Sequence, residues 1–260
     1  MLRSTTPRGI AWQGFGITAR PDRWWVQPVV TGTAFAVFVL YALFSAFLWK
    51  PLFGVPYETQ GYLSPFFSPL FGEGILPPLT PGILILWAPL GFRLTCYYCR
   101  RAYYRTYLAD PPACAVAEPR PHARYALERR LPFILQNLHR FFLYAAIVPV
   151  IFLWLDTWFS LRYEGQWRIG LGNTLLFVET VLVTGYTLSC HSMRHLAGGR
   201  LDRFSAGATN RVRHLAWRFL TMLNVRHMEW FWVSLVSVVL ADLYVRLLAA
   251  GAFVDPNIRL

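Results

Sequence analysis

The sequence predicts an all-α integral membrane protein, a bundle of five transmembrane helices with its N-terminus in the cytoplasm. Of the 260 residues, 55% are hydrophobic and only 15% are charged, whereas soluble globular domains average ~45–50% apolar and ~25% charged residues. Aromatic residues reach 17%, as expected of a protein whose rings line both membrane interfaces. Long apolar stretches separated by polar segments supply the predicted spans.

The first three spans follow from the roughly 20 apolar residues that a helix needs to cross the bilayer core. Residues 28–49 form an apolar stretch without a charged side chain. Residues 81–98 contain an internal proline and carry Arg93. Residues 132–155 carry His139 near their beginning and end in an apolar run. We expect each of these segments to be a transmembrane helix.

The last two spans contain ionisable side chains. Residues 170–195 hold Glu179 in an apolar run, and residues 228–250 hold Asp242 and Arg246 one helical turn apart. Ionisable groups inside a membrane are costly and normally face the interior of the bundle. We therefore expect either a proton path through Glu179 and Asp242, or a structural ion pair between Asp242 and Arg246.

The distribution of arginine predicts the orientation of the chain. The formal charge is +12, and Lys50 is the only lysine. Arginines crowd the N-terminal segment and the segments after the second and fourth spans. Because basic residues stay in the cytoplasm, we expect a multi-pass protein of the cytoplasmic (inner) membrane, with its N-terminus inside. The retention of basic residues in the cytoplasm and the binding of an acidic partner together explain the positive net charge. We therefore expect no nucleic-acid partner. No internal repeat or long linker is evident, so residues 1–260 are expected to form one domain.

Two of the predicted spans end in cysteine and histidine residues at the cytoplasmic level. The second ends in Cys96 and Cys99, and the fourth ends in Cys190, His191 and His195. Residues three or four apart share one face of a helix. We therefore expect Cys96 and Cys99 to hold one metal ion and His191 and His195 another, with Cys190 as a reserve ligand.

Several kinds of centre use this ligand set. Two thiolates on one iron and two imidazoles on its neighbour describe a Rieske-type [2Fe–2S] cluster, whereas zinc binds two cysteines and two histidines on a single ion. Mononuclear iron is a third option. Without a metal, the cysteines would pack as small apolar residues and the histidines would reach water.

Two stretches at the ends of predicted spans are LTCYYCRR (residues 94–101) and SCHSMRH (residues 189–195). Together with the layout of the spans and the arginine-rich inner surface, they resemble the membrane-anchor subunits of succinate:quinone oxidoreductases. In particular, residues 28–250 resemble the single-chain, five-helix anchors of actinobacterial succinate dehydrogenase. The resemblance implies that flavoprotein and iron–sulfur subunits dock on the cytoplasmic face, and that electrons pass to a menaquinone-like quinone. The anchor alone would not oxidise succinate, because the chain has no dinucleotide-binding fingerprint. Assembly into a higher oligomer is left open.

The resemblance places the quinone at the inner ends of the second to fourth spans. Arg93, Tyr97 and His139 lie in these segments. Arginine and tyrosine can donate hydrogen bonds to the quinone carbonyls, and histidine can deliver a proton. Arg93 has the alternative of extending its charge to the membrane interface.

The sequence departs from the haem-binding branch of this family. Five-helix anchors commonly hold two b haems through pairs of histidines, but the first span has no histidine and the fifth has only His227 at its edge. Two haems are therefore not expected, and one haem held by His139 with His191 or His195 is the alternative. Our hypothesis is that a Rieske-type [2Fe–2S] centre replaces the haems. A zinc-stabilised scaffold and a small-solute transporter remain as alternative functions.

Overall fold

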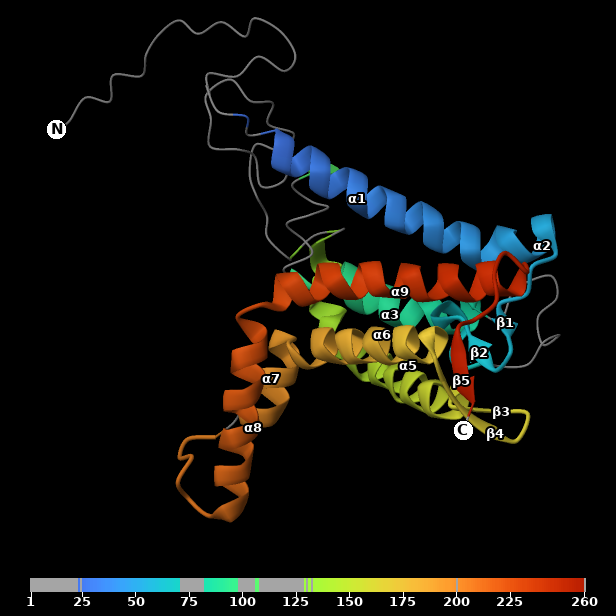
Figure 1. Ribbon diagram of the computed structural model, residues 1–260. Coiled ribbons are helices and arrows are strands. Elements are labelled where there is room, and N and C mark those ends of the chain that lie inside the picture. The colour runs from blue at the N-terminus through green and yellow to red at the C-terminus, as the bar shows by residue number, and fades with distance from the viewer. Residues whose placement is uncertain are drawn as a thin grey trace, which may run out of the picture.

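The computed structural model is a bundle of helices that lie side by side, with small antiparallel sheets at one end and a pair of projecting helices at the other (Figure 1). It describes residues 23, 25–70, 82–97, 106–107, 129, 131, 133–199 and 201–259. The helices of the bundle are α1 (Val26–Leu43), α3 (Ile83–Leu94), α5 (His139–Ser160), α6 (Leu171–Leu188) and α9 (His227–Ala249).

Four helical segments are long and apolar enough to cross a membrane. Two of them include short turns: α1 continues through the π-helical η1 (Phe44–Leu48) into α2 (Trp49–Phe53), and α5 follows the 3-10 turn η4 (Phe133–Leu138). Half of the most apolar 18-residue stretch of α9 is buried inside the protein, whereas 17% of the corresponding stretch of the segment that includes α5 is buried. The four segments are Val26–Phe53, Ile134–Ser160, Leu171–Leu188 and His227–Ala249. α9 is therefore the central helix and α5 a peripheral one.

The second predicted span differs from the expectation. α3 has 12 residues, about 18 Å of helix at ~1.5 Å per residue, whereas the bilayer core is ~30 Å thick. The helix ends at Leu94, and the Thr95 hydroxyl then donates to the carbonyl of Gly91 at 2.7 Å. The described residues therefore contain four helices of spanning length and one short apolar helix, and the expected count of five is not confirmed.

The end of the bundle that carries the strands, here called the sheet end, is closed by two tight hairpins. Their turns, Gln60–Gly61 and Glu164–Gly165, have positive φ at both residues, as two-residue turns that follow the twist of antiparallel strands require. The second hairpin pairs with the C-terminal strand, with Ile169 opposite Ile258. The strands are β1 (Glu58–Thr59), β2 (Tyr62–Leu63), β3 (Arg162–Tyr163), β4 (Gln166–Gly170) and β5 (Asn257–Arg259), and the 3-10 turn η2 (Pro65–Phe67) follows β2.

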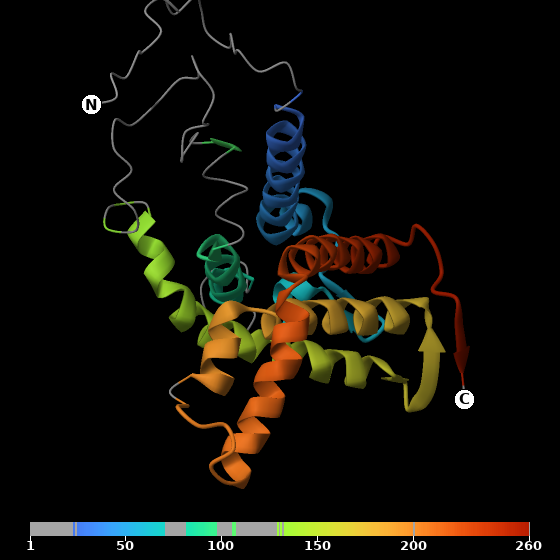
Figure 2. The same cartoon turned by 90° about the vertical axis from the view of Figure 1, so that its left-hand side faces the viewer.

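The opposite end, here called the α7–α8 end, carries two helices that turn away from the bundle in both views (Figures 1 and 2). These are α7 (His191–Gly198) and α8 (Ala208–Asn224). The turn arises at Cys190, whose extended backbone (φ −64°, ψ 140°) ends one helix, while its sulfur accepts the Ser192 N–H and caps the next. The predicted fourth span, 170–195, is therefore too long, and its last residues belong to α7.

Candidate metal centre and ligand cavity

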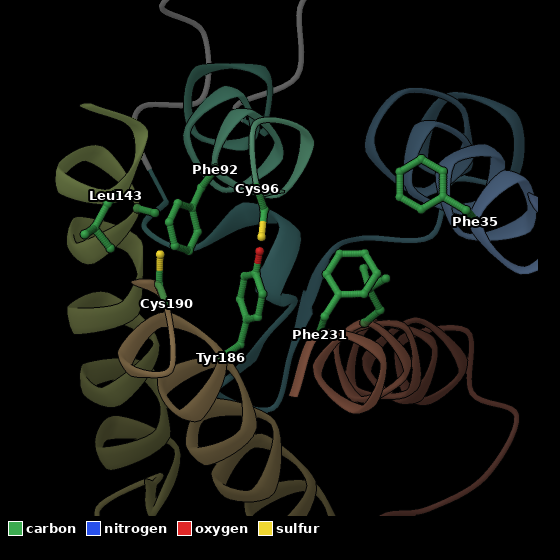
Figure 3. Close-up of a cluster of buried hydrophobic side chains, with 9 residues drawn as sticks. Phe35, Phe92, Cys96, Leu143, Tyr186, Cys190 and Phe231 are labelled. Carbon is green, nitrogen blue, oxygen red and sulfur yellow. The ribbon is translucent and has the colours of Figure 1, made fainter. Parts of the chain in front are cut away.

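α3 and α6 end in the same local sequence, a leucine followed by a hydroxyl residue and a cysteine. These residues are Leu94-Thr95-Cys96 after α3 and Leu188-Ser189-Cys190 after α6. Figure 3 shows the two sulfur atoms extending from their helices into one space beside Tyr186 and Phe92. Both cysteines are buried, and neither forms a disulfide within the described part of the chain. Two helix ends thus deliver two thiols to one apolar region of the α7–α8 end.

Two other helices begin at this region with a histidine. His139 is the first residue of α5, and His227 is the first residue of α9. The Nε2 atom of His227 lies 3.3 Å from the Cys96 sulfur, and the Nε2 atom of His139 lies 3.0 Å from the Cys190 sulfur. The structure therefore forms two thiol–imidazole pairs, and each pair joins helices that are distant in sequence.

Hydroxyl groups contact the other nitrogen of each ring. The Thr95 hydroxyl oxygen lies 3.0 Å from Nδ1 of His139, and the Ser189 hydroxyl oxygen lies 2.6 Å from Nδ1 of His227. Each imidazole is therefore held between a hydroxyl from one helix end and a thiol from the other helix end.

Aromatic rings enclose the two imidazoles. Phe92 stacks on His139 with ring centroids 4.7 Å apart, and Tyr186 stacks on His227 with centroids 5.0 Å apart. Phe92 and Tyr186 also meet edge to face. Both thiols, Phe92 and Tyr186 belong to one cluster of buried apolar side chains. His227 is also buried, and His139 is half-buried at the edge of this cluster. Low local polarity strengthens electrostatic interactions in such a setting.

Arg93 lies beside the pairs and extends into the bundle rather than to the membrane interface. Its guanidinium donates to the Ser234 hydroxyl at 2.9 Å and to the carbonyl of Phe231 at 3.3 Å. It also lies over the ring of Tyr186, 4.4 Å from the centroid. The residue is only 8% exposed. The structure thus directs this permanent donor inward, to the wall of a cavity.

The cavity has a volume of about 310 Å³ and lies among α1, α3, α5, α6 and α9. Its lining is mostly aromatic and aliphatic, and it includes a basic side chain, Arg93, and an acidic one, Glu179. Glu179 is fully buried. One carboxyl oxygen accepts from the Thr180 hydroxyl at 3.3 Å, and the other has no hydrogen-bond partner among the described residues. The site therefore combines an apolar volume with two polar groups suited to an oxygen-bearing ligand.

Asp242 and Arg246 form an ion pair, the contact on which one of the two expectations for them depends. Both side chains are fully buried, with the Arg246 Nε 3.5 Å from a carboxylate oxygen of Asp242. Asp242 also accepts hydrogen bonds from Tyr41 at 2.7 Å, from Ser45 at 2.6 Å and from Ser64. These contacts connect α9 to α1, to η1 and to the segment after β2.

The other predicted site residues lie elsewhere. His191 and His195 are exposed on α7. Partial desolvation of the His191 ring, together with the charge of Arg194, lowers the pKa of His191. Tyr97 is 64% exposed, and Cys99 lies outside the described residues. Within the described part of the chain, no three Cys, His, Asp or Glu side chains converge as ligands of one ion.

From the sequence, Cys190 was expected only as a reserve ligand and His227 was considered only for haem, while His139 was expected at the quinone or, alternatively, at one haem. The sequence did contain one sign that the two cysteines lie together. The Leu-(Thr/Ser)-Cys pattern occurs at the ends of both the second and the fourth spans. Two spans that end alike are a reason to pair Cys96 with Cys190 rather than with Cys99.

Comparison with known proteins gives two matches. The family model of the actinobacterial succinate dehydrogenase subunit SdhC matches residues 26–251. Among solved structures, the chain is similar to a chain of the Mycobacterium smegmatis Sdh1 complex in the apo form, with 39% sequence identity, a TM-score of 0.82 and 93% of each chain covered. Comparison with the curated proteins gives no match.

Proposed function

This chain belongs to the family of the actinobacterial succinate dehydrogenase subunit SdhC, and from that premise we propose that it anchors the complex and conducts electrons to quinone. As the membrane subunit, it would bind the flavoprotein and iron–sulfur subunits and receive electrons from the latter. The solved relative is part of an Sdh1 complex, which supports this assembly.

The proposed redox centre is held by Cys96, Cys190, His139 and His227. Two thiols and two imidazoles are the ligand set of a Rieske-type [2Fe–2S] cluster, and the two close thiol–imidazole contacts carry this proposal. Thiolate and neutral imidazole are the forms that bind metal, so binding of the cluster would release the thiol protons. When bound, the cluster would supply one-electron transfer at a potential that histidine ligation raises above that of an all-cysteine cluster.

This ligand set differs from the one that spacing suggested. The proposed set keeps Cys96 and includes Cys190, the former reserve ligand, in place of Cys99. It includes His139 and His227 in place of His191 and His195. A two-iron cluster needs only two protein ligands on each iron, so it does not require three of these side chains to meet at one point. The set with Cys99, His191 and His195 is the competing assignment.

The cavity is the proposed site of a menaquinone-like ligand. Its apolar lining suits a ring system, and Arg93 lies at its wall beside Tyr186, where a permanent cation can donate to a carbonyl that gains charge on reduction. His139 is assigned to the metal centre instead, because both of its ring nitrogens are engaged. Tyr97 is not among the residues that line the cavity.

Glu179 is the proposed proton-binding group of the cavity. A carboxylate at this depth is costly, and one oxygen of Glu179 has no hydrogen-bond partner among the described residues. The side chain is therefore expected to be neutral and able to share its proton with a ligand oxygen. Asp242 is not retained in the path, because Arg246 and three hydroxyl groups already hold it.

The α7–α8 end is proposed to face the cytoplasm, with the N-terminus on the same side. The exposed arginines of this end include Arg203, Arg211, Arg218 and Arg226, and basic residues remain inside. Their charge suits an acidic docking surface of the soluble subunits. At the sheet end Arg168 is buried, with its guanidinium 4.1 Å from the Tyr62 ring centroid.

The test is a spectrum of the whole purified complex, fully reduced, together with its iron, zinc and haem content. A Rieske-like EPR signal in excess of the clusters carried by the iron–sulfur subunit would support the proposal. Sharp b-type absorption bands would replace the cluster by haem. Stoichiometric zinc without an additional signal would favour a structural scaffold.

A further inference from the structure

Two hydroxyl groups lie against Nδ1 of the two imidazoles. The Thr95 hydroxyl oxygen lies 2.7 Å from the carbonyl oxygen of Gly91, and the Ser189 hydroxyl oxygen lies 2.8 Å from the carbonyl oxygen of Tyr186. A carbonyl oxygen only accepts, so each hydroxyl must donate its single proton there. Each hydroxyl oxygen is then left with lone pairs only.

The ring nitrogens at these oxygens must therefore be donors. Nδ1 of His139 faces the Thr95 oxygen at 3.0 Å, and Nδ1 of His227 faces the Ser189 oxygen at 2.6 Å. Both nitrogens consequently carry a hydrogen. In a neutral imidazole the other nitrogen then has a free lone pair, and in both residues this is the Nε2 atom that faces sulfur.

We infer that Thr95 and Ser189 are positioning residues that hold both histidines in the Nδ1–H tautomer and make Nε2 the ligating atom of each. The arrangement is crossed: each Leu-(Thr/Ser)-Cys segment gives its hydroxyl to one imidazole and its thiol to the other. The orientation of both rings therefore depends on both helix ends. This inference rests on the proposed metal centre, and it adds the identity of the ligating atoms and the residues that select them.

A consequence concerns protons. The N–H of each ring would donate a hydrogen bond to a hydroxyl at the end of α3 or α6. It would therefore not donate a hydrogen bond or a proton to a ligand in the cavity. The centre would pass electrons without passing a proton from its histidines. Since a hydrogen-bond acceptor behind a ligating histidine raises the basicity of that ligand, the two hydroxyls would also lower the reduction potential of the centre.

The direct test uses the whole complex from cells fed with histidine labelled with ¹⁵N at either Nδ1 or Nε2. Pulsed EPR of the reduced centre then reports which nitrogen is bound to iron. We expect the strong hyperfine coupling to change from a ¹⁴N to a ¹⁵N pattern when Nε2 carries the label. It should keep its ¹⁴N pattern when Nδ1 carries the label. Strong coupling from the Nδ1 label would overturn the inference.

A second test removes the hydroxyls. Thr95→Val and Ser189→Ala should raise the midpoint potential of the centre and weaken retention of iron against a chelator roughly 10-fold or more. Thr95→Ser and Ser189→Thr should restore both properties. The matched control is Thr184→Val, because the Thr184 hydroxyl donates to a backbone carbonyl and accepts a ring N–H from Trp154 in the same way, but away from the centre.

The outcomes separate this inference from the proposed function. If the wild-type complex has no Rieske-like signal, the proposed centre fails. If the signal is present and the hydroxyl-free variants keep its potential, its spectrum and its iron, the centre stands and the positioning role is refuted.

Discussion

The sulfur of Cys96 lies 3.3 Å from Nε2 of His227, although 131 positions separate the two residues in the chain. The contact joins the end of α3 to the beginning of α9, and the matching contact of Cys190 with His139 joins α6 to α5. Four helices of the bundle are therefore connected through four side chains at one end. A cofactor bound there would be held by helix ends, which are more rigid than loops.

Replacement of Arg93 tests the quinone cavity. Arg93→Met removes a charged donor whose hydrogen bond to a ligand carbonyl is worth about 1.5–3 kcal/mol, so succinate:quinone activity should fall roughly 10- to 100-fold. Succinate oxidation with a soluble artificial acceptor should be unchanged, because it uses the partner subunits. Ser234→Ala, which removes only one partner of Arg93, should have a smaller effect. Full quinone reductase activity in Arg93→Met would remove Arg93 from the site.

Glu179→Gln tests the proton-binding role. Glutamine keeps the volume and the hydrogen bond to Thr180 but cannot release a proton, so quinone reduction should slow by roughly 100-fold or more if Glu179 is a general acid. The steady-state rate should be measured over a range of pH, with the EPR spectrum as a check that the centre is intact. A variant that turns over at the wild-type rate at every pH would exclude Glu179 from proton transfer.

Asp242→Ala tests the structural reading of the buried ion pair. The substitution leaves the buried Arg246 without its counter-ion, which costs about 3–5 kcal/mol in comparable pairs. We expect a lower midpoint temperature in thermal unfolding of the purified complex. The double variant Asp242→Leu, Arg246→Met should recover part of the loss, since no charge is then left buried. Unchanged stability together with impaired proton transfer would favour a path through Asp242.

The orientation can be measured with single cysteines on the two ends of the bundle. Glu164 lies exposed in the turn between β3 and β4, and Ser205 lies exposed between α7 and α8. An impermeant maleimide added to intact cells should label Glu164→Cys and leave Ser205→Cys unlabelled. The reverse pattern would place the N-terminus outside.

The helical membrane fold was largely predictable, because apolar length and composition alone mark a span. Four predicted segments coincide with helices long enough to cross a bilayer. The short α3 and the break at Cys190 were not predictable in the same way, because helix ends depend on local capping and on packing. The two small sheets were also missed, since their strands are two to five residues long.

The candidate site was predictable in its elements but not in its pairings. The ends of the second and fourth spans do approach each other, because Cys96 and Cys190 belong to one buried cluster. The histidine partners, however, come from the first residues of α5 and α9, and a shift of one residue rotates a side chain by about 100°. Spacing within one helix cannot reveal contacts among four helices.

The most direct test of the central claim compares Cys190→Ser with His195→Ala in the reduced complex, by low-temperature EPR and iron analysis. Our account predicts that Cys190→Ser loses the Rieske-like signal and its iron, while His195→Ala keeps both. A signal that persists in Cys190→Ser and disappears in His195→Ala would contradict the account and return the ligands to the α7 histidines.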